Sequence, residues 1–151
     1  MEVRFYHLTH SPLERALPAL IQKALGVGKK IVLVAPDEGR LNALDEGLWT
    51  WDAGSFTPHG NALKKKEGGA EQPLWLTLDA TDRANDADML VLTGNSICTD
   101  FSGYTLCCEM LNGYDNEAVE AGRTRWKDYK DKGYDLTYWQ QTQTGGWEKK
   151  A

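Results

Sequence analysis

Short apolar runs alternate along the chain with stretches that have a helical period. Three of the runs are apolar throughout or rich in β-branched and aromatic residues, and they predict strands at residues 3–8, 30–35 and 89–93. The run at 30–35, KIVLVA, has no polar position after its lysine, so we expect burial on both faces, as in a parallel sheet. Weaker patterns predict strands at residues 74–78 and 104–111, the second with a short helix as the alternative.

Helical patterns follow the first two strands. The segment SPLE beginning at Ser11 is typical of a helix start, because the serine can cap the helix and the proline suits its first position. Apolar residues then keep a helical period up to Gly26, with an interruption at Pro18. Asp37 is placed to cap a second helix over residues 38–49. The resulting β-α-β-α order predicts a doubly wound α/β fold.

The last helix is expected over residues 117–132, with Asn116 or Asp115 as its N-cap and Gly133 as its left-handed stop. Acidic residues lie near its start and basic residues near its end, which is the distribution that the helix dipole favours. At about 100° per residue, one face gathers small residues, an arginine and a tyrosine, which suits close packing on a sheet. The residues of that face are Ala118, Ala121, Gly122, Arg125 and Tyr129.

One flank of this helix combines bases with a tryptophan. Its residues are Val119, Arg123, Trp126, Lys127 and Lys130. Cations beside an indole suit an acidic ligand with an apolar end, so the flank is a candidate binding site. The alternative is a solvated face on which the tryptophan covers the stem of a neighbouring side chain.

The remaining segments carry weaker signals. Residues 55–59, SFTPH, predict a short extended piece at an edge of the sheet, because proline cannot donate to a central ladder. Residues 60–73 are rich in glycine, lysine and glutamate and predict a mobile loop. A second loop is expected at residues 94–103, and residues 137–151 form a polar tail with two tryptophans.

Composition limits the class of protein. The 151 residues are 41% apolar and 26% charged, which indicates one globular domain with a sizeable core. The net charge of −5 argues against wrapping by nucleic acid, which needs a broad basic surface. No signal peptide and no apolar run long enough for a membrane span is found, so we expect a cytoplasmic protein.

The cysteines are Cys98, Cys107 and Cys108. Their odd number and the absence of CxxC or Cys/His spacing predict neither a disulfide scaffold nor a metal site. In a strand, the two adjacent cysteines point to opposite faces, so at least one is expected in the core. This usage fits a reducing compartment.

The α/β order invites a nucleotide-site hypothesis, but the usual motifs are missing. No GxxxxGK[ST] or GxSxG motif is present and no GxGxxG follows a strand, so no cofactor is expected. An alternative function is a small enzyme or nucleotide-binding protein whose site lies at the strand C-terminal ends, near His7, His10 and Asp37.

Two further alternatives have less support. A catalytic group of Cys98, His59 and Asp100 is conceivable, but no local motif indicates it. Direct binding of single-stranded DNA through exposed tryptophans and the lysines at residues 64–66 is opposed by the net negative charge.

Three segments, read in order, resemble the chi subunit of bacterial DNA polymerase III holoenzyme. LDEGLW at residues 44–49 followed by SFTPH at 55–59 is similar to the "LDE-LW … SF-PH" pattern of that family. RTRWKDYKDKGYDL at residues 123–136 resembles its final helix, and FYHL at the start fits its first strand. Residues 60–88 match nothing in that pattern, and the residues after 136 resemble an extension found in part of the family.

The resemblance implies a single chi-like domain over residues 1–151, with 137–151 as a C-terminal extension. It implies a three-layer α/β/α fold with a mostly parallel, Rossmann-like sheet that lacks a nucleotide-binding loop. It also implies a non-enzymatic clamp-loader accessory subunit that acts in DNA replication. Such a subunit links the polymerase to single-stranded DNA-binding protein by gripping the acidic, Phe-ended C-terminal tail of the latter. By family position Arg123, Trp126 and Lys127 are expected to bind that tail, and Lys130 is added from its place on the flank.

A second surface in the family binds the psi subunit of the clamp loader and, in some members, a repair helicase. The resemblance assigns Phe56 to this surface, with Trp51 and Trp49 as weaker neighbours. For Trp49 a core position is the favoured alternative. The longer tail indicates a lineage in which psi is absent or unrecognisable, so the choice between the two partners stays open.

Overall fold

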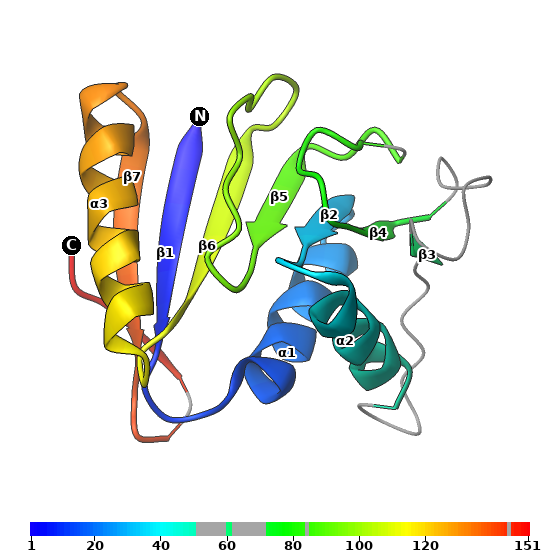
Figure 1. The fold of residues 1–151 in the computed structure, drawn as a ribbon, viewed down its shortest axis with the longest axis horizontal. Helices are drawn as coiled ribbons and strands as arrows, with labels where there is room; N and C mark the ends of the chain where they lie inside the picture. Colours follow the sequence, from blue (N-terminus) through cyan, green and yellow to red (C-terminus); the bar gives the residue numbers. More distant parts are fainter. Residues whose placement is uncertain (51–59, 62–71, 84, 145) are drawn as a thin grey trace.

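The structure is a computed structural model that describes residues 1–50, 60–61, 72–83, 85–144 and 146–151. Helices cover both faces of one sheet (Figure 1). In chain order the elements are β1 (Glu2–Leu8), α1 (Leu13–Gly26), β2 (Ile31–Val34), α2 (Glu38–Thr50), β3 (Gly60–Asn61), β4 (Leu74–Thr77), β5 (Met89–Leu92), β6 (Leu106–Asn112), α3 (Asn116–Asp131), β7 (Asp135–Gln141) and β8 (Trp147–Lys149).

The strands form one eight-stranded sheet in the order β3-β4-β2-β5-β6-β1-β7-β8. All neighbouring pairs are parallel except β7 and β8, which are antiparallel. The first strand lies in the interior of the sheet, between β6 and β7. The expected mostly parallel α/β fold is therefore confirmed.

Each face of the sheet carries its own core. Leu17 of α1 and residues of α2 pack on one face, and Trp126 and Tyr129 of α3 pack on the other against Phe5. Figure 1 shows α3 lying along β1 and β7, away from α1 and α2. Cys108 belongs to the first core and Cys107 to the second, so the prediction that they point to opposite faces is confirmed.

The predicted last helix is confirmed to within one residue at each end. Asp115 is its N-cap, and the side chain accepts a hydrogen bond from the N–H of Glu117 at 3.0 Å. Gly133 follows with a φ of +82°, as a left-handed stop requires. A side chain at Gly122 would place its Cβ 2.8 Å from Leu111 of β6, so the glycine lets α3 approach the sheet closely.

The predicted serine cap of α1 is wrong. The helix starts one residue later than expected, with Pro12 in the N-cap position and without a side-chain cap hydrogen bond. Ser11 instead contacts Gln141 of β7, whose Oε1 accepts from the N–H groups of His10 at 2.9 Å and Ser11 at 2.8 Å. The Ser11 hydroxyl accepts from Gln141 Nε2 at 3.1 Å, so this side chain is held by β7 instead of capping the helix.

Two loop predictions have different outcomes. Residues 94–103 contain no regular element, as expected, and the residues that follow form β6 rather than the alternative helix. The loop predicted for residues 60–73 is wrong at its start, because Gly60 and Asn61 form β3 and pair with β4. The extended piece predicted at residues 55–59 lies outside the described residues.

The C-terminal segment is more ordered than the polar-tail prediction indicated. It contributes two strands, and β7 pairs with β1 over its whole length up to Gln140. Tyr138 faces the core under α3, whereas Trp139 packs with the core under α1. The alternation of a strand is therefore present, but threonine and glutamine residues obscure it in the sequence.

Candidate functional site

A hollow of about 400 Å³ lies between α3 and β7, and we call it the α3–β7 hollow. It is lined by Leu111, Glu120, Gly122, Arg123, Thr124, Trp126, Lys127, Tyr138 and Ala151. The structure therefore brings together three of the predicted site residues, Arg123, Trp126 and Lys127. Lys130 is exposed one turn further along the helix and is not among the lining residues.

The apolar wall of the hollow is a cluster of aromatic rings. Trp126 packs edge-on against Phe5, with 5.3 Å between ring centroids, and against Tyr138, at 5.9 Å. Phe5 and Tyr138 are nearly parallel at 6.3 Å. These edge and offset contacts hold the indole in place. Trp126 is thus a fixed surface on which an apolar group can pack, rather than a loose cover for a lysine stem.

A histidine of β1 contacts the hydroxyl of Tyr138 and holds this side chain in place. Its hydroxyl lies 2.6 Å from Nδ1 of His7. Burial lowers the pKa of His7, and the positive charge of Arg123 lowers it further. The imidazole is therefore neutral at pH 7, and the cationic character of the hollow comes from its arginine and lysine.

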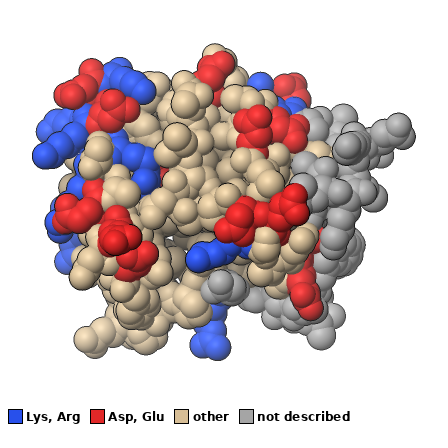
Figure 2. Space-filling model, in the orientation of Figure 1, with Lys and Arg blue, Asp and Glu red and all other residues tan. Residues whose placement is uncertain are grey.

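The cations at the rim remain available to a ligand. Arg123 Nη1 donates to Glu120 Oε1 at 2.7 Å, but both side chains are more than two-thirds exposed, at 68% and 69%. Such a surface pair is weak, so an incoming carboxylate can compete for the guanidinium. Figure 2 shows Lys and Arg side chains mixed with acids on the side where α3 lies, so the basic site is local rather than part of a broad basic surface.

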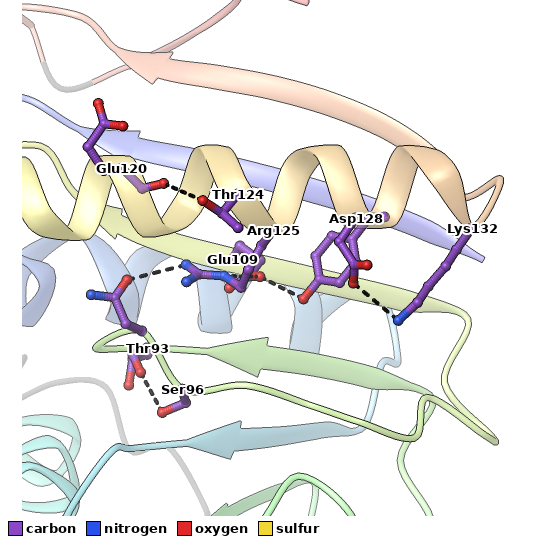
Figure 3. A network of polar contacts seen from close by, with 10 residues as sticks. Thr93, Ser96, Glu109, Glu120, Thr124, Arg125, Asp128 and Lys132 are labelled. Carbon is purple, nitrogen blue, oxygen red and sulfur yellow. Dashed lines mark hydrogen bonds and ion pairs between the residues drawn. The ribbon is translucent and has the colours of Figure 1, made fainter.

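A buried polar network fixes α3 on the sheet (Figure 3). Glu109 of β6, 1% exposed, accepts from Arg125 Nε at 2.8 Å and from the hydroxyl of Tyr129 at 2.9 Å. Arg125 Nη2 also donates to Asn95 Oδ1 at 3.3 Å. Burial raises the pKa of Glu109, and the charge of Arg125 opposes that rise. This network fixes the rotation of α3 about its axis, so that Arg123, Trp126 and Lys127 line the hollow.

A second hollow, of about 450 Å³, lies at the C-terminal ends of the strands, where the alternative nucleotide site was expected. Asp37 lines it, whereas His7 and His10 do not. The charged residues among its lining are Asp37, Asp115 and Arg40. Both aspartates already accept from helix N-terminal N–H groups. Two carboxylates against one guanidinium do not favour a phosphate.

Several sequence-based candidates lie outside the described residues, namely Phe56, Trp51, His59 and the lysines at 64–66; nothing is described of the Trp49 side chain either. Cys98 is buried and its Sγ donates to the carbonyl of Asp100 at 3.1 Å. Burial raises the pKa of this thiol, which opposes a role as nucleophile. Within the described ranges, no helix is long and apolar enough to cross a membrane.

On the wall of the α3–β7 hollow opposite the helix, Tyr138 and Ala151 were not predicted from the sequence. Both come from the segment that was predicted to be a polar tail. The alternating aromatic residues at positions 138 and 139 were the available signal. The partner of Arg125 was missed as well, although Glu109 is the one charged residue in an otherwise apolar strand core.

Comparison with known proteins agrees with these features. A family model described as "DNA polymerase III chi subunit, HolC" matches residues 1–137. The chain is also similar to the DNA polymerase III subunit chi of Escherichia coli (strain K12), with 28% identity over 109 residues that cover 72% of each chain. The family match covers all of α3 and the start of β7, and it ends before β8. The chain belongs to the DNA polymerase III chi subunit family.

Proposed function

We propose that this protein is a non-catalytic accessory subunit of the polymerase III holoenzyme that links the clamp loader to single-stranded DNA-binding protein. In this proposal the α3–β7 hollow holds the acidic C-terminal tail of that protein. The observation that carries the proposal is the placement of Arg123 and Lys127 beside the aromatic wall of Trp126 and Tyr138. Family membership supports the same role.

The chemistry of the hollow matches a peptide end that is both acidic and aromatic. A terminal ring can pack against the fixed indole of Trp126, and the terminal and side-chain carboxylates can reach Arg123 and Lys127. Because these cations are exposed, their contribution is screened by salt. The ring contact is not screened, so binding should weaken with salt without disappearing.

A second partner surface is proposed at Phe56 and Trp51, for a psi subunit or a repair helicase. Support for it comes from the family membership and from the SFTPH segment that contains Phe56. In this arrangement the surface at Phe56 binds the replicase or the helicase, and the α3–β7 hollow binds single-stranded DNA-binding protein. The protein itself then needs neither catalysis nor direct contact with nucleic acid.

A peptide titration tests the proposal. Fluorescence anisotropy of a labelled acidic peptide ending in Asp-Phe is measured against wild type, Trp126→Ala and Lys127→Ala. Loss of an anchoring tryptophan should weaken binding by about 30-fold or more, and loss of one rim cation by about three- to fivefold. Lys132→Ala is the matched control, because Lys132 pairs with Asp128 beyond the hollow. Absence of binding by wild type, or equal affinity in all variants, refutes the proposal.

The nucleotide alternative is tested on the same protein by thermal shift. ATP or NAD should leave the melting temperature unchanged, whereas the acidic peptide should raise it through linkage. A clear rise in melting temperature with a nucleotide, and none with the peptide, would favour the nucleotide-binding alternative over the proposed function. The variant Arg40→Ala, in the strand-end hollow, then locates the nucleotide.

A further inference from the structure

Among the described strands, β8 is the outermost on one side of the sheet and pairs along one edge only, with β7. In an antiparallel pair, successive residues direct their N–H and C=O groups alternately toward and away from the partner strand. The N–H of Lys150 donates to the Tyr138 carbonyl at 2.8 Å, and the N–H of Thr142 donates to the Gly146 carbonyl at 2.8 Å. The groups of Trp147 and Lys149 therefore face outward, and no other strand of the described chain pairs with them.

This edge ends at the rim of the α3–β7 hollow. The N–H groups of Lys150 and Ala151 both donate to the Tyr138 carbonyl, at 2.8 and 3.4 Å, and the Tyr138 N–H donates to the Ala151 carbonyl at 3.2 Å. Two residues thus oppose one, which is the pattern of a β-bulge. Tyr138 and Ala151 are also lining residues of the hollow. The bulge that follows β8 is therefore part of the wall of the hollow.

We propose that an acidic peptide whose last residue occupies the α3–β7 hollow continues as an extended strand along the outer edge of β8. The inference rests on the proposed function, and it adds how the upstream part of the peptide is recognised. Neighbouring strands lie about 4.8 Å apart and an extended residue spans about 3.3 Å. The outer edge is one spacing away from Ala151 and two spacings away from Tyr138 of β7, so about two to three residues cross from the hollow to a position paired with Lys149.

Charge and pairing chemistry favour this occupant. Main-chain hydrogen bonds to an open edge give affinity that does not depend on the peptide sequence. Lys149 and Lys150 are exposed beside the edge. Lys150 lies 3.3 Å from Glu148, an exposed pair that is weak enough for an acidic chain to compete for the lysine. Lysine on an exposed strand edge also disfavours pairing of that edge with a second copy.

A proline substitution separates backbone pairing from charge. Lys149→Pro removes the outward N–H but leaves the ladder with β7 intact, because Lys149 sits at a position whose N–H does not face that strand. Lys149→Ala is the matched control, since it removes the charge and keeps the N–H. Affinities are measured for a peptide of about four residues and one of about ten residues with the same Asp-Phe end; the longer one extends past β8.

For wild type, the long peptide should bind about five- to tenfold tighter than the short one. Lys149→Pro should abolish that gain, and Lys149→Ala should keep most of it at moderate salt. N-methylation of the long peptide at successive upstream amides should weaken binding at every second position, as a strand requires. Equal affinity of both peptides for wild type, or tolerance of N-methylation at all positions, would overturn the inference and leave the proposed function standing.

Failure of both peptides to bind refutes the proposed function itself. Sedimentation of the protein alone tests the remaining occupant of the edge. A dimer that Lys149→Pro dissociates would show that β8 pairs with a second copy, and it would overturn the peptide assignment.

Discussion

Replacement of Arg125 by methionine should destabilise the protein, because it leaves the buried carboxylate of Glu109 without its positively charged partner. Methionine fills a similar volume but provides no positive charge and no donor. Arg125 is 12% exposed and Glu109 is 1% exposed, so water cannot take over the lost hydrogen bond. Breaking one side of a buried ion pair costs about 3–5 kcal/mol. We expect the lower end, about 3 kcal/mol, because the Tyr129 hydroxyl still donates to Glu109.

The loss should depend on pH in a defined direction. Burial already holds the pKa of Glu109 above its ordinary value, and the variant removes the two Arg125 contributions that lower it. The folded variant therefore keeps its proton to higher pH than the folded wild type does. A carboxyl whose folded pKa is raised loses stability as pH rises from its unfolded pKa to its folded pKa, and the loss levels off above that. The loss continues to higher pH in the variant than in the wild type, so the difference between them should be larger at pH 8 than at pH 5.5.

Urea denaturation followed by tryptophan fluorescence at these pH values measures the effect. A loss of about 3 kcal/mol corresponds to a fall of about 6–12 °C in melting temperature for a domain of this size. Arg123→Met is the control, because that side chain is 68% exposed and should cost less than about 0.5 kcal/mol. A loss below about 1 kcal/mol, or one that does not change with pH, would contradict the role given to the Glu109–Arg125 pair.

Two other substitutions test the packing that positions the site. Gly122→Ala should destabilise the protein by about 1–3 kcal/mol, because the added methyl group crowds Leu111. Gly47→Ala in α2, where the space is open, should stabilise the protein by about 0.5–1 kcal/mol. Chemical denaturation compares the two variants, and equal effects would refute the close approach of α3 to the sheet. Gln141→Ala should cost about 1–3 kcal/mol, because it leaves two N–H groups ahead of α1 without their acceptor, and hydrogen exchange at His10 and Ser11 should accelerate selectively.

The α3 flank was predictable because its information is local. Cap residues at both ends fix the bounds of the helix, and helical spacing alone places Arg123, Trp126 and Lys127 on one flank. Lys130 has the same angular position but lies too far along the axis to line the hollow. A helical wheel gives direction around the axis, not distance along it, so this difference required the structure.

The opposite wall of the hollow was not predictable from local pattern. Tyr138 reaches it through the pairing of β7 with β1, which are more than 120 residues apart in sequence. Glu109 likewise meets Arg125 only because α3 packs on β6. Before α1, the local sequence favours a serine cap, but Gln141 of β7 binds the Ser11 hydroxyl and the N–H groups of His10 and Ser11. Each of these contacts depends on pairing between segments that are distant in sequence, and the hydrophobic period of a segment does not show which distant segment it will contact.

The intact partner tests whether the α3–β7 hollow holds the acidic tail of single-stranded DNA-binding protein. Sedimentation velocity compares mixtures of this protein with full-length single-stranded DNA-binding protein and with the same partner lacking its acidic C-terminal tail. We expect a complex with the full-length partner alone, and loss of that complex when Trp126→Ala replaces the wild type. A complex of equal strength with the truncated partner, or one unaffected by Trp126→Ala, would contradict it.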